Sequence, residues 1–540
     1  MKRRRRSGGP QGERGTRPQG AARGAHGAAS AGATRWTRWV AYAFIAMFTI
    51  YWASQAFTIH RIGNYAVETD FYWKYGPAAR DLAHGAIDIA NYDSKGWGYP
   101  AVVTAVSAFG FETFRAGQIV ALLSAALALF LLYRLHRSLF GPGVALAGML
   151  ILAGNKIFLA NTYEVGTDMF FLAVTLASIA LLLRSHAPGW RAILASGLLG
   201  GWAFSTRYNG LVLWPGALAL FLLFRVPTGP PGARWRRAAL YTAGFAVGAL
   251  PWLWINAAHT GNPLTNSNYV NVGYAVYGEG NWEKFFYGSR NIHSFADVVK
   301  LDPGRFVTAM VKNVGDHLRR DLFELMSPIW GILAVLGAIL LALERPGRRI
   351  SGYLAFGLLT FLSLVPVFYG ARFSLPLLPF YVALATWPFA SPRVAQPFAG
   401  MERAFPVRAF AFLVLWIPVG ASAYGWTKDV SNPENVQSGP HDLDPAVSFL
   451  REQPPGAALM ARKPHAAFLA NMRFVPMPDA SSPDSLRAEA LKGNARYVLI
   501  SGIEYGTRLA ARTLASQPDP PPGWKRVFES QGALVFEVQR

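Results

Sequence analysis

The chain has 540 residues, of which 52% are hydrophobic, and its 52 basic and 30 acidic residues give a net charge of +22. It contains no cysteine, which excludes disulfides, thiol catalysis and cysteine-based metal sites. Apolar runs of about 20 residues, the length that crosses about 30 Å of hydrocarbon, recur from Trp39 to Trp426. The composition therefore excludes an ordinary soluble protein and indicates one that crosses the membrane many times.

Much of the basic charge is concentrated at the N-terminus. Residues 1–38 hold ten basic residues and one acidic residue in a Gly- and Ala-rich context. Such a composition predicts a disordered cytoplasmic tail that binds anionic lipid headgroups. We expect no nucleic-acid partner, because this charge lies directly beside the first apolar run.

The apolar runs predict an α-helical polytopic membrane protein with about eleven transmembrane helices between residues 39 and 426. Arginines cluster in the loops that face the cytoplasm if the N-terminus is inside, whereas the short outer turns hold few cations. We therefore expect a multi-pass protein of the plasma (inner) membrane with a cytoplasmic N-terminus and an extracytoplasmic C-terminus. The predicted spans are 39–57, 115–135, 141–160, 166–184, 189–206, 209–225, 237–258, 326–344, 350–369, 373–389 and 407–426.

Three longer segments are predicted to face outward. Residues 58–114 form a first outer loop with a helix at 71–84 and an apolar stretch at 99–110, too short to span, that would be interfacial or re-entrant. Residues 259–325 form a second outer loop, and residues 427–540 a small α/β domain. The strands expected in this domain are 457–462, 496–501, 525–529 and 533–538, with a helix at 483–493 between the first two.

The first outer loop begins with two acids, Glu68 and Asp70, followed by an aromatic cluster that contains Lys74. Carboxylates at a partly dehydrated membrane surface can act as general bases. The alternative is that they cap the helix that starts near Phe71. Asp168 begins another predicted span on the outer side, where a functional role and a capping role are compatible.

Three cations lie in or beside short outer turns, where the charge rule disfavours them: Lys156, Arg207 and Arg372. A phosphate at the outer interface would bind them, and a guanidinium binds phosphate oxygens through two hydrogen bonds. The alternatives are ion pairs with Asp70 or Asp168, and snorkelling toward lipid headgroups. The histidines show no metal-ligand spacing and the glycines form no phosphate-binding loop, so we predict no metal site and no nucleotide-dependent enzyme.

Six short motifs follow one another along the chain: Glu68-Thr69-Asp70-Phe71, Gly98-Tyr99-Pro100, Thr167-Asp168, Thr206-Arg207-Tyr208-Asn209-Gly210, Gly261-Asn262-Pro263 and Arg372-Phe373-Ser374-Leu375-Pro376-Leu377-Leu378-Pro379. In this order and topology they resemble the polytopic C-type glycosyltransferases that use lipid-linked sugars. The nearest group is the bacterial protein O-mannosyltransferases and aminoarabinose transferases. The resemblance covers about residues 38–540.

The resemblance implies a polyprenyl-phosphate-linked sugar as donor, an unknown acceptor on the outer face, and inversion at the anomeric carbon by single displacement. It implies a catalytic base at Asp70, with Glu68 as a second catalytic candidate. Many relatives have adjacent acids, whereas Thr69 separates the two here. No cofactor is implied, and the sequence leaves a divalent metal ion open. The residues expected to bind substrate are Asp168, Lys74, Arg207, Arg372, Tyr99 and Lys156.

Two other functions compete with a glycosyltransferase acting in the cell envelope. One is a transporter or flippase of lipid or sugar, and the other is a non-catalytic envelope scaffold. The sequence has no detectable internal repeat, and its polar candidates gather at one membrane face rather than at the midplane. Both observations favour the enzyme.

Overall fold

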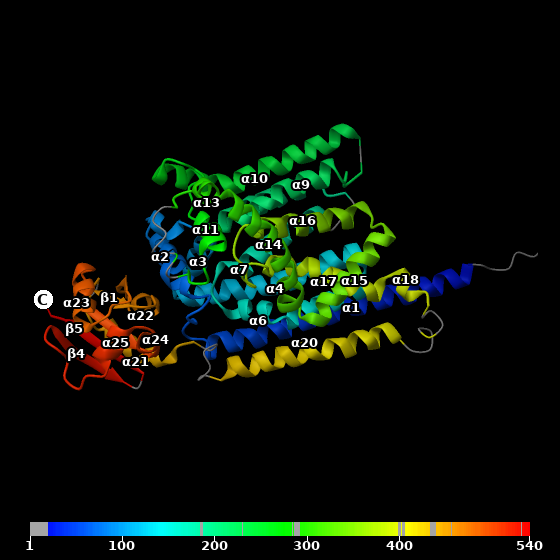
Figure 1. Ribbon diagram of the computed structural model, residues 1–540. Helices are drawn as coiled ribbons and strands as arrows, with labels where there is room; N and C mark the ends of the chain where they lie inside the picture. Colours follow the sequence, from blue (N-terminus) through cyan, green and yellow to red (C-terminus); the bar gives the residue numbers. More distant parts are fainter. Residues whose placement is uncertain are drawn as a thin grey trace, which may run out of the picture.

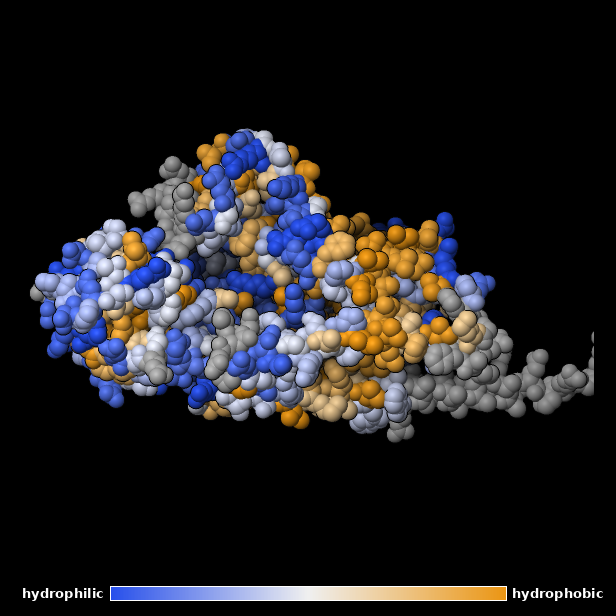
Figure 2. Space-filling model, turned by 60° about the horizontal axis from the view of Figure 1, so that its bottom comes forward, coloured by the Kyte–Doolittle hydropathy of each residue, from blue (hydrophilic) through white to orange (hydrophobic). Residues whose placement is uncertain are grey.

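The computed structural model describes residues 20–539, apart from 184–186, 229, 283–284, 286–291, 398–400, 402–405, 433–438, 455 and 531. The described chain is a bundle of helices with a small α/β domain at one end (Figure 1). The first helix begins at the end of the bundle that lies away from this domain. On the face shown in Figure 2, hydrophobic residues gather on the part of the bundle that lies away from the domain, and hydrophilic residues dominate the domain.

Each predicted span coincides with one helix of the bundle or with two consecutive ones, because apolar helices satisfy their own backbone hydrogen bonds. A short helix, α18 (Pro392–Ala395), lies between the last two spans. The bundle helices are α1 (Gly20–Thr58), α4 (Thr113–Phe140), α5 (Pro142–Gly154) with α6 (Lys156–Tyr163), α7 (Thr167–Leu183), α8 (Trp190–Thr206), η3 (Tyr208–Val212) with α9 (Leu213–Leu222), α10 (Pro231–Thr260), α15 (Pro328–Glu344), α16 (Arg348–Leu364), η5 (Leu375–Leu377) with α17 (Leu378–Ala390), and α20 (Val407–Ser431).

Four described helices, α1, α4, α10 and α20, are long and apolar enough to cross a membrane, and α5 with α6 would make a fifth span bent by 67°. Asn155 explains this bend. Its side-chain oxygen accepts hydrogen bonds from the backbone N–H groups of Ile157 and Phe158, and its amide donates to the carbonyl of Leu325 at 2.7 Å. The full count of eleven stays a prediction, since the remaining helices are shorter.

The beginning of α1 differs from the predicted disordered tail. Residues 1–19 lie outside the described residues, but α1 starts at Gly20, so residues 20–38 are helical. This stretch is rich in alanine, which has the highest helix propensity, and it extends a helix that has already formed. The prediction of disorder is therefore corrected for residues 20–38.

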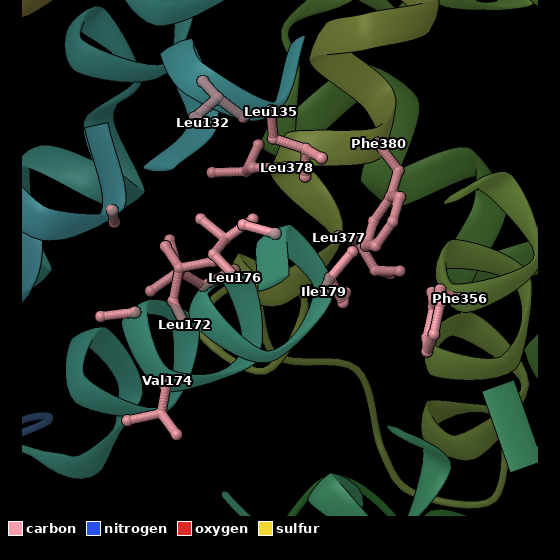
Figure 3. Packing of buried hydrophobic residues seen from close by; sticks show 14 of the residues in the cluster. Leu132, Leu135, Leu172, Val174, Leu176, Ile179, Phe356, Leu377, Leu378 and Phe380 are labelled. Carbon is pink, nitrogen blue, oxygen red and sulfur yellow. The ribbon is translucent and has the colours of Figure 1, made fainter. Parts of the chain in front are cut away.

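Small residues allow two bundle helices to approach closely. A Cβ atom added to Gly197 of α8 would lie 2.2 Å from the carbonyl oxygen of Tyr241 in α10, and one added to Gly201 would lie 2.1 Å from that of Phe245. Such contacts replace the hydrophobic effect as a source of helix association in lipid. Elsewhere large aliphatic and aromatic side chains from α4, α7, α16 and the η5–α17 segment interdigitate (Figure 3).

The outer loops are largely helical. The predicted helix at 71–84 consists of a π-helical turn, η1 (Phe71–Tyr75), followed by α2 (Gly76–Ala83). The apolar stretch predicted as interfacial or re-entrant forms α3 (Gly98–Ser107). The remaining helices among the described loop residues are η2 (Ile89–Tyr92) in the first loop, and α11 (Tyr269–Tyr277), α13 (Phe295–Leu301), α14 (Pro303–Arg320) and the π-helical η4 (Asp321–Leu325) in the second.

The C-terminal domain contains a five-stranded sheet in the order β2-β1-β3-β5-β4. β1 is parallel to β2 and β3, whereas β5 is antiparallel to β3 and β4, and β3 is buried along its whole length. The four predicted strands are present. The elements are η7 (His441–Leu443), α21 (Asp444–Arg451), β1 (Ala458–Ala461), α22 (His465–Leu469), β2 (Arg473–Pro476), α23 (Pro483–Lys492), β3 (Tyr497–Ser501), α24 (Gly502–Thr507), α25 (Leu509–Ala515), β4 (Trp524–Ser530) and β5 (Ala533–Val538).

The domain contacts the first outer loop through α22 and the turn before it. The ring of His465 lies 4.2 Å from that of Tyr72, and its Nε2 donates to the carbonyl of Asn64 at 3.1 Å. The Lys463 ammonium donates to the carbonyl of Tyr65 at 2.9 Å and to the Thr69 hydroxyl at 3.3 Å. The domain is thus fixed against the residues that immediately precede Asp70.

Candidate active site

A cavity of about 610 Å³ lies between both outer loops, the turn after α8, the segment 364–373 and the C-terminal domain. Between the domain and the bundle the surface is hollowed and largely hydrophilic (Figure 2). Basic residues outnumber acidic ones among the described lining, so the cavity favours an anionic ligand. Its charged lining residues are Lys74, Lys95, Arg207, Arg372, Arg462, Lys463, Arg508, Asp70 and Asp93.

Asp70 lies at the start of η1 and lines the cavity. Its side chain makes no capping hydrogen bond, which argues against the capping alternative. Instead, its Oδ2 accepts a hydrogen bond from Arg372 at 3.1 Å and lies 3.6 Å from the ammonium of Lys95. One carboxylate oxygen is therefore flanked by two cations from segments almost 280 residues apart in the sequence, as the numbering of Lys95 and Arg372 shows.

The charges around Asp70 decide its protonation. Burial raises the pKa of Asp70, but the positive charges of Lys95 and Arg372 outweigh burial and lower it to about 2. Burial lowers the pKa of Lys95 to about 8, although Asp70 opposes that shift. Burial also lowers the pKa of Arg372, but Asp70 and Asp168 raise it by more, so it stays protonated. At neutral pH the site thus holds one carboxylate between two cations.

Lys74 and Asp93 form a second ion pair in the cavity wall. Lys74 therefore lines the same cavity as Asp70 and Arg372, and its ion-pair partner is Asp93. Lys95, two residues after Asp93, also donates to the hydroxyl of Tyr75. Two lysines and two acids of the first loop, Lys74, Lys95, Asp70 and Asp93, therefore line the cavity.

Asp168 and Arg207 form a third ion pair, in which the guanidinium of Arg207 also donates to the Thr167 hydroxyl at 3.3 Å. Arg207 lines the cavity, whereas Asp168 is buried behind it. Pairing with an acid, the alternative to phosphate binding, thus occurs for both Arg207 and Arg372. It does not remove either guanidinium from the cavity wall.

Glu68 lies outside the cavity. Its side chain is fully buried and accepts hydrogen bonds from His60 Nε2 at 2.7 Å, the backbone N–H of Asn64 at 2.7 Å and that of Val165 at 2.6 Å. With these partners the carboxylate joins the first loop to the turn before α7. The geometry corrects the predicted catalytic role of Glu68 to a structural one, because no reacting group can reach a carboxylate packed in this way.

Two other candidates also lie away from the cavity. Tyr99 is fully buried, with its ring 5.8 Å from that of Tyr75 in a cluster of aromatic side chains. Lys156 is exposed at the start of α6 and is not among the residues that line the cavity. Substrate contact by Tyr99 or Lys156 therefore finds no support in the geometry. The other predicted residues gather around Asp70.

Sequence reasoning missed Lys95 and the contribution of the C-terminal domain. Lys95 follows an Asp-Ser pair in a short loop, and only the fold shows that it faces Asp70. Arg462, Lys463 and Arg508 lie in turns of the domain, where a basic residue carries no periodic signal. The one usable hint was that Lys95 lies two residues after Asp93, in the same loop as Asp70 and Lys74.

The described acids and histidines do not form a metal site. Among the described residues, no group of three or more His, Asp or Glu side chains is placed so that it could hold a metal ion. The acids of the cavity are each paired with a cation instead. The prediction that no cofactor is needed stays a prediction.

Comparison with known proteins supplies the context of this site. Residues 99–254 match the family model described as dolichyl-phosphate-mannose-protein mannosyltransferase. The crystal structure of ArnT from Cupriavidus metallidurans bound to undecaprenyl phosphate is similar to this chain, with a TM-score of 0.52 and 15% identity. The match covers 93% of this chain and 98% of the ArnT chain. The predicted resemblance to the C-type glycosyltransferases is confirmed.

A second solved structure extends this finding. The archaeal oligosaccharyltransferase AglB from Archaeoglobus fulgidus, in complex with an inhibitory peptide and a dolichol-phosphate, has a TM-score of 0.58 and 13% identity. The match covers 87% of this chain and 70% of AglB. No curated protein sequence matched. The C-type glycosyltransferase fold therefore extends over most of the chain, including the bundle and the outer loops.

Proposed function

We propose that this protein is a membrane glycosyltransferase that moves a sugar from a polyprenyl-phosphate donor to an acceptor on the outer face of the membrane, in glycosylation of the cell envelope. The observation that carries the proposal is the carboxylate of Asp70 flanked by Lys95 and Arg372 in a basic cavity beside the bundle. Undecaprenyl phosphate on ArnT and dolichol-phosphate on AglB support the donor class.

Arg372 and Lys95 bind the donor phosphate in this proposal. When the bond between the anomeric carbon and the phosphate oxygen breaks, its electron pair leaves with the polyprenyl phosphate. Two cations fixed at that position stabilise the developing charge, and a partly buried site strengthens the effect. These residues neutralise the leaving phosphate whether or not a divalent ion also binds.

Asp70 acts as the general base. The acceptor hydroxyl oxygen attacks the anomeric carbon, its proton passes to Asp70, and the phosphate leaves from the opposite side, so the anomeric configuration inverts. A carboxylate with a pKa near 2 is a weak base. Donor phosphate bound to Lys95 and Arg372 brings negative charge close to Asp70. This charge offsets the effect of the two cations and raises the pKa of Asp70 when a base is needed.

The proposal includes an orientation in the membrane. The start of α1 and the C-terminal domain lie at opposite ends of the bundle (Figure 1), which supports their placement on opposite sides of the membrane. The arginine-rich loops support a cytoplasmic N-terminus and an outer C-terminal domain. The cavity lies at the end of the bundle that bears this domain. In this orientation the basic N-terminal tail binds anionic lipids on the cytoplasmic side of the membrane.

The test is a donor-binding and sugar-transfer assay on purified Asp70→Asn. Asparagine keeps the shape of aspartate but cannot accept the proton, so transfer should fall by about 10²- to 10⁴-fold while the polyprenyl phosphate still binds. Asp93→Asn, in the same cavity, is the matched control and should reduce transfer far less. Near-normal transfer by Asp70→Asn would refute the base assignment. If the wild-type protein moves labelled lipid across vesicles without sugar transfer, a flippase is supported instead.

A further inference from the structure

Helix α14 of the second outer loop exposes an apolar stripe. Val307, Val311, Val314 and Leu318 are 59%, 71%, 42% and 45% exposed. Their spacing of three or four residues places all four on one side of the helix. Large aliphatic side chains gathered on one exposed face mark a contact with an apolar phase or a partner.

The opposite side of α14 holds the segment that carries Arg372. The amide of Asn313 donates to the carbonyl of Val365 at 3.0 Å, and Nε2 of His317 donates to that of Val367 at 3.0 Å. One turn further on, the guanidinium of Arg320 lies 4.2 Å from the ring centre of Tyr369. Asn313, His317 and Arg320 are spaced as neighbours on one helix face.

The π-helical turn that follows continues this contact. The carboxylate of Asp321 in η4 is fully buried and accepts a hydrogen bond from the hydroxyl of Tyr381 at 3.0 Å. Tyr381 belongs to α17, which begins six residues after Arg372. The backbone on both sides of Arg372 is therefore tied to the α14–η4 element.

The continuity of the chain indicates what covers the apolar stripe. η4 leads directly into the apolar helix α15, where Ile332 and Ile339 are 60% and 53% exposed. Phe323 of η4, 45% exposed, lies between the two exposed apolar surfaces in the sequence. α14 lies against the bundle rather than on the C-terminal domain (Figure 1). A lipid bilayer around the bundle would reach both surfaces.

We propose that α14 is a membrane-interface helix that positions Arg372: its apolar stripe rests in the lipid leaflet next to the cavity, and its opposite face holds the backbone at Val365 and Val367. The positioning part rests on the proposed function, because it assumes that Arg372 binds the donor phosphate. Lipid contact thereby fixes the depth of the phosphate site relative to a donor whose hydrocarbon chain lies in the same leaflet.

The lipid contact can be tested on the full chain because it has no native cysteine. A nitroxide spin label is attached to Val311→Cys or, as control, to Lys312→Cys, in nanodiscs of phosphatidylethanolamine and phosphatidylglycerol. Adjacent helical residues point about 100° apart. Oxygen, which concentrates in lipid, should relax the label at 311, and a water-soluble nickel chelate should relax the label at 312. Equal exposure of both labels to the nickel chelate, or a covalent dimer formed through Val311→Cys, would overturn the lipid assignment.

The positioning part is tested by binding of polyprenyl phosphate to Asn313→Ala and His317→Ala. Loss of one hydrogen bond should weaken binding about threefold to tenfold in each variant. His317→Gln, whose side-chain amide can donate to the same carbonyl, should restore part of the affinity. Thr308→Ala, on the exposed side of the helix, is the control and should bind normally.

Arg372→Ala, measured in parallel, separates failure of this inference from failure of the proposed function. If Arg372→Ala weakens binding but both α14 variants bind normally with a lowered melting temperature, the positioning role is overturned and the phosphate role stands. If Arg372→Ala binds normally, the phosphate role and the positioning role are both overturned. The spin-label result decides the lipid contact in either case.

Discussion

Substitution of Arg372 best distinguishes a phosphate-binding role from a purely structural ion pair. The structure pairs it with Asp70 while leaving it in the cavity wall. If it binds the donor phosphate, Arg372→Ala should weaken binding by about 1.5–3 kcal/mol, the range for a hydrogen bond to a charged group. Arg372→Lys should also impair binding, because an ammonium does not reproduce the planar pair of donors.

Isothermal titration with polyprenyl phosphate and thermal unfolding in detergent, on the same purified variants, check this prediction. An unchanged affinity together with a lowered melting temperature would assign Arg372 a structural role with Asp70. Arg319→Ala, which changes an exposed arginine away from the cavity, is the matched control and should leave binding unchanged.

The titration of Lys95 should make the binding of polyprenyl phosphate depend on pH. Its pKa is lowered by burial to about 8, so its positive charge is present below that pH and is lost above it. Because the cation binds the phosphate and the neutral amine does not, affinity for polyprenyl phosphate should fall as the pH rises through about 8. Binding titrations on either side of that pH measure the effect. In Lys95→Arg the charge persists, since arginine titrates above about 12, so a fall in affinity that survives in this variant would exclude Lys95 as its source.

From the sequence, the role of a single residue could be predicted only from its type and from the side of the membrane on which it was expected to lie. Asp70 and Arg372 were found because charges beside apolar runs are costly and therefore informative, whereas Lys74 was found only through the family resemblance. Glu68 shares the same local pattern as Asp70, and only the packing shows that it is buried among His60 and backbone N–H groups. Lys95 was missed for the same reason, because its partners come from other parts of the chain.

At the scale of elements, the close contact between α8 and α10 makes a quantitative prediction. A methyl group at Gly201 would overlap the backbone of α10, so Gly201→Ala should separate the helices and destabilise the protein by about 1–3 kcal/mol, the usual cost of overpacking. The helix preference of alanine offsets up to about 1 kcal/mol of this. Thermal unfolding in detergent measures the difference.

Gly143, in the first turn of α5, is the matched control, because nothing lies within 4 Å of a Cβ atom added there. Gly143→Ala should leave the melting temperature unchanged or slightly higher. Equal melting temperatures for Gly201→Ala and Gly143→Ala would contradict close packing of α8 against α10.

Elements with a long regular pattern were predictable, and irregular ones were not. The apolar runs and four strands of the C-terminal domain follow from periodicity and composition. β2 was missed because it has four residues, lies at the sheet edge and ends at Pro476, which cannot donate to a ladder. The break at Asn155 and the π-helical turns of η1 and η4 depend on side-chain contacts with distant segments. η1 follows directly after Asp70, and η4 contacts Tyr381 in the helix that follows Arg372, in keeping with the frequent occurrence of π-helices at functional sites.

At the scale of the whole molecule, the prediction concerns topology. The beginning of α1 and the C-terminal domain lie at opposite ends of the bundle (Figure 1). A reporter that is active only outside the cytoplasm, fused after residue 540, should therefore be active. The same reporter inserted after residue 346, in the arginine-containing loop between α15 and α16, should be inactive. The reverse pattern would place the cavity on the cytoplasmic side and exclude an outer-face donor.

If Asp70 is the base and Arg372 binds the donor phosphate, as proposed, their ion pair also sets the order in which substrates can enter. While the pair is intact, the positive charge of Arg372 lowers the proton affinity of the carboxylate, which then takes a proton from an acceptor hydroxyl only poorly. Donor phosphate competes for Arg372 and releases the carboxylate, so an acceptor that arrives first meets a base that is too weak to act. The enzyme would therefore follow a compulsory order, donor before acceptor. Initial-rate kinetics should show an acceptor analogue to be an uncompetitive inhibitor with respect to the donor.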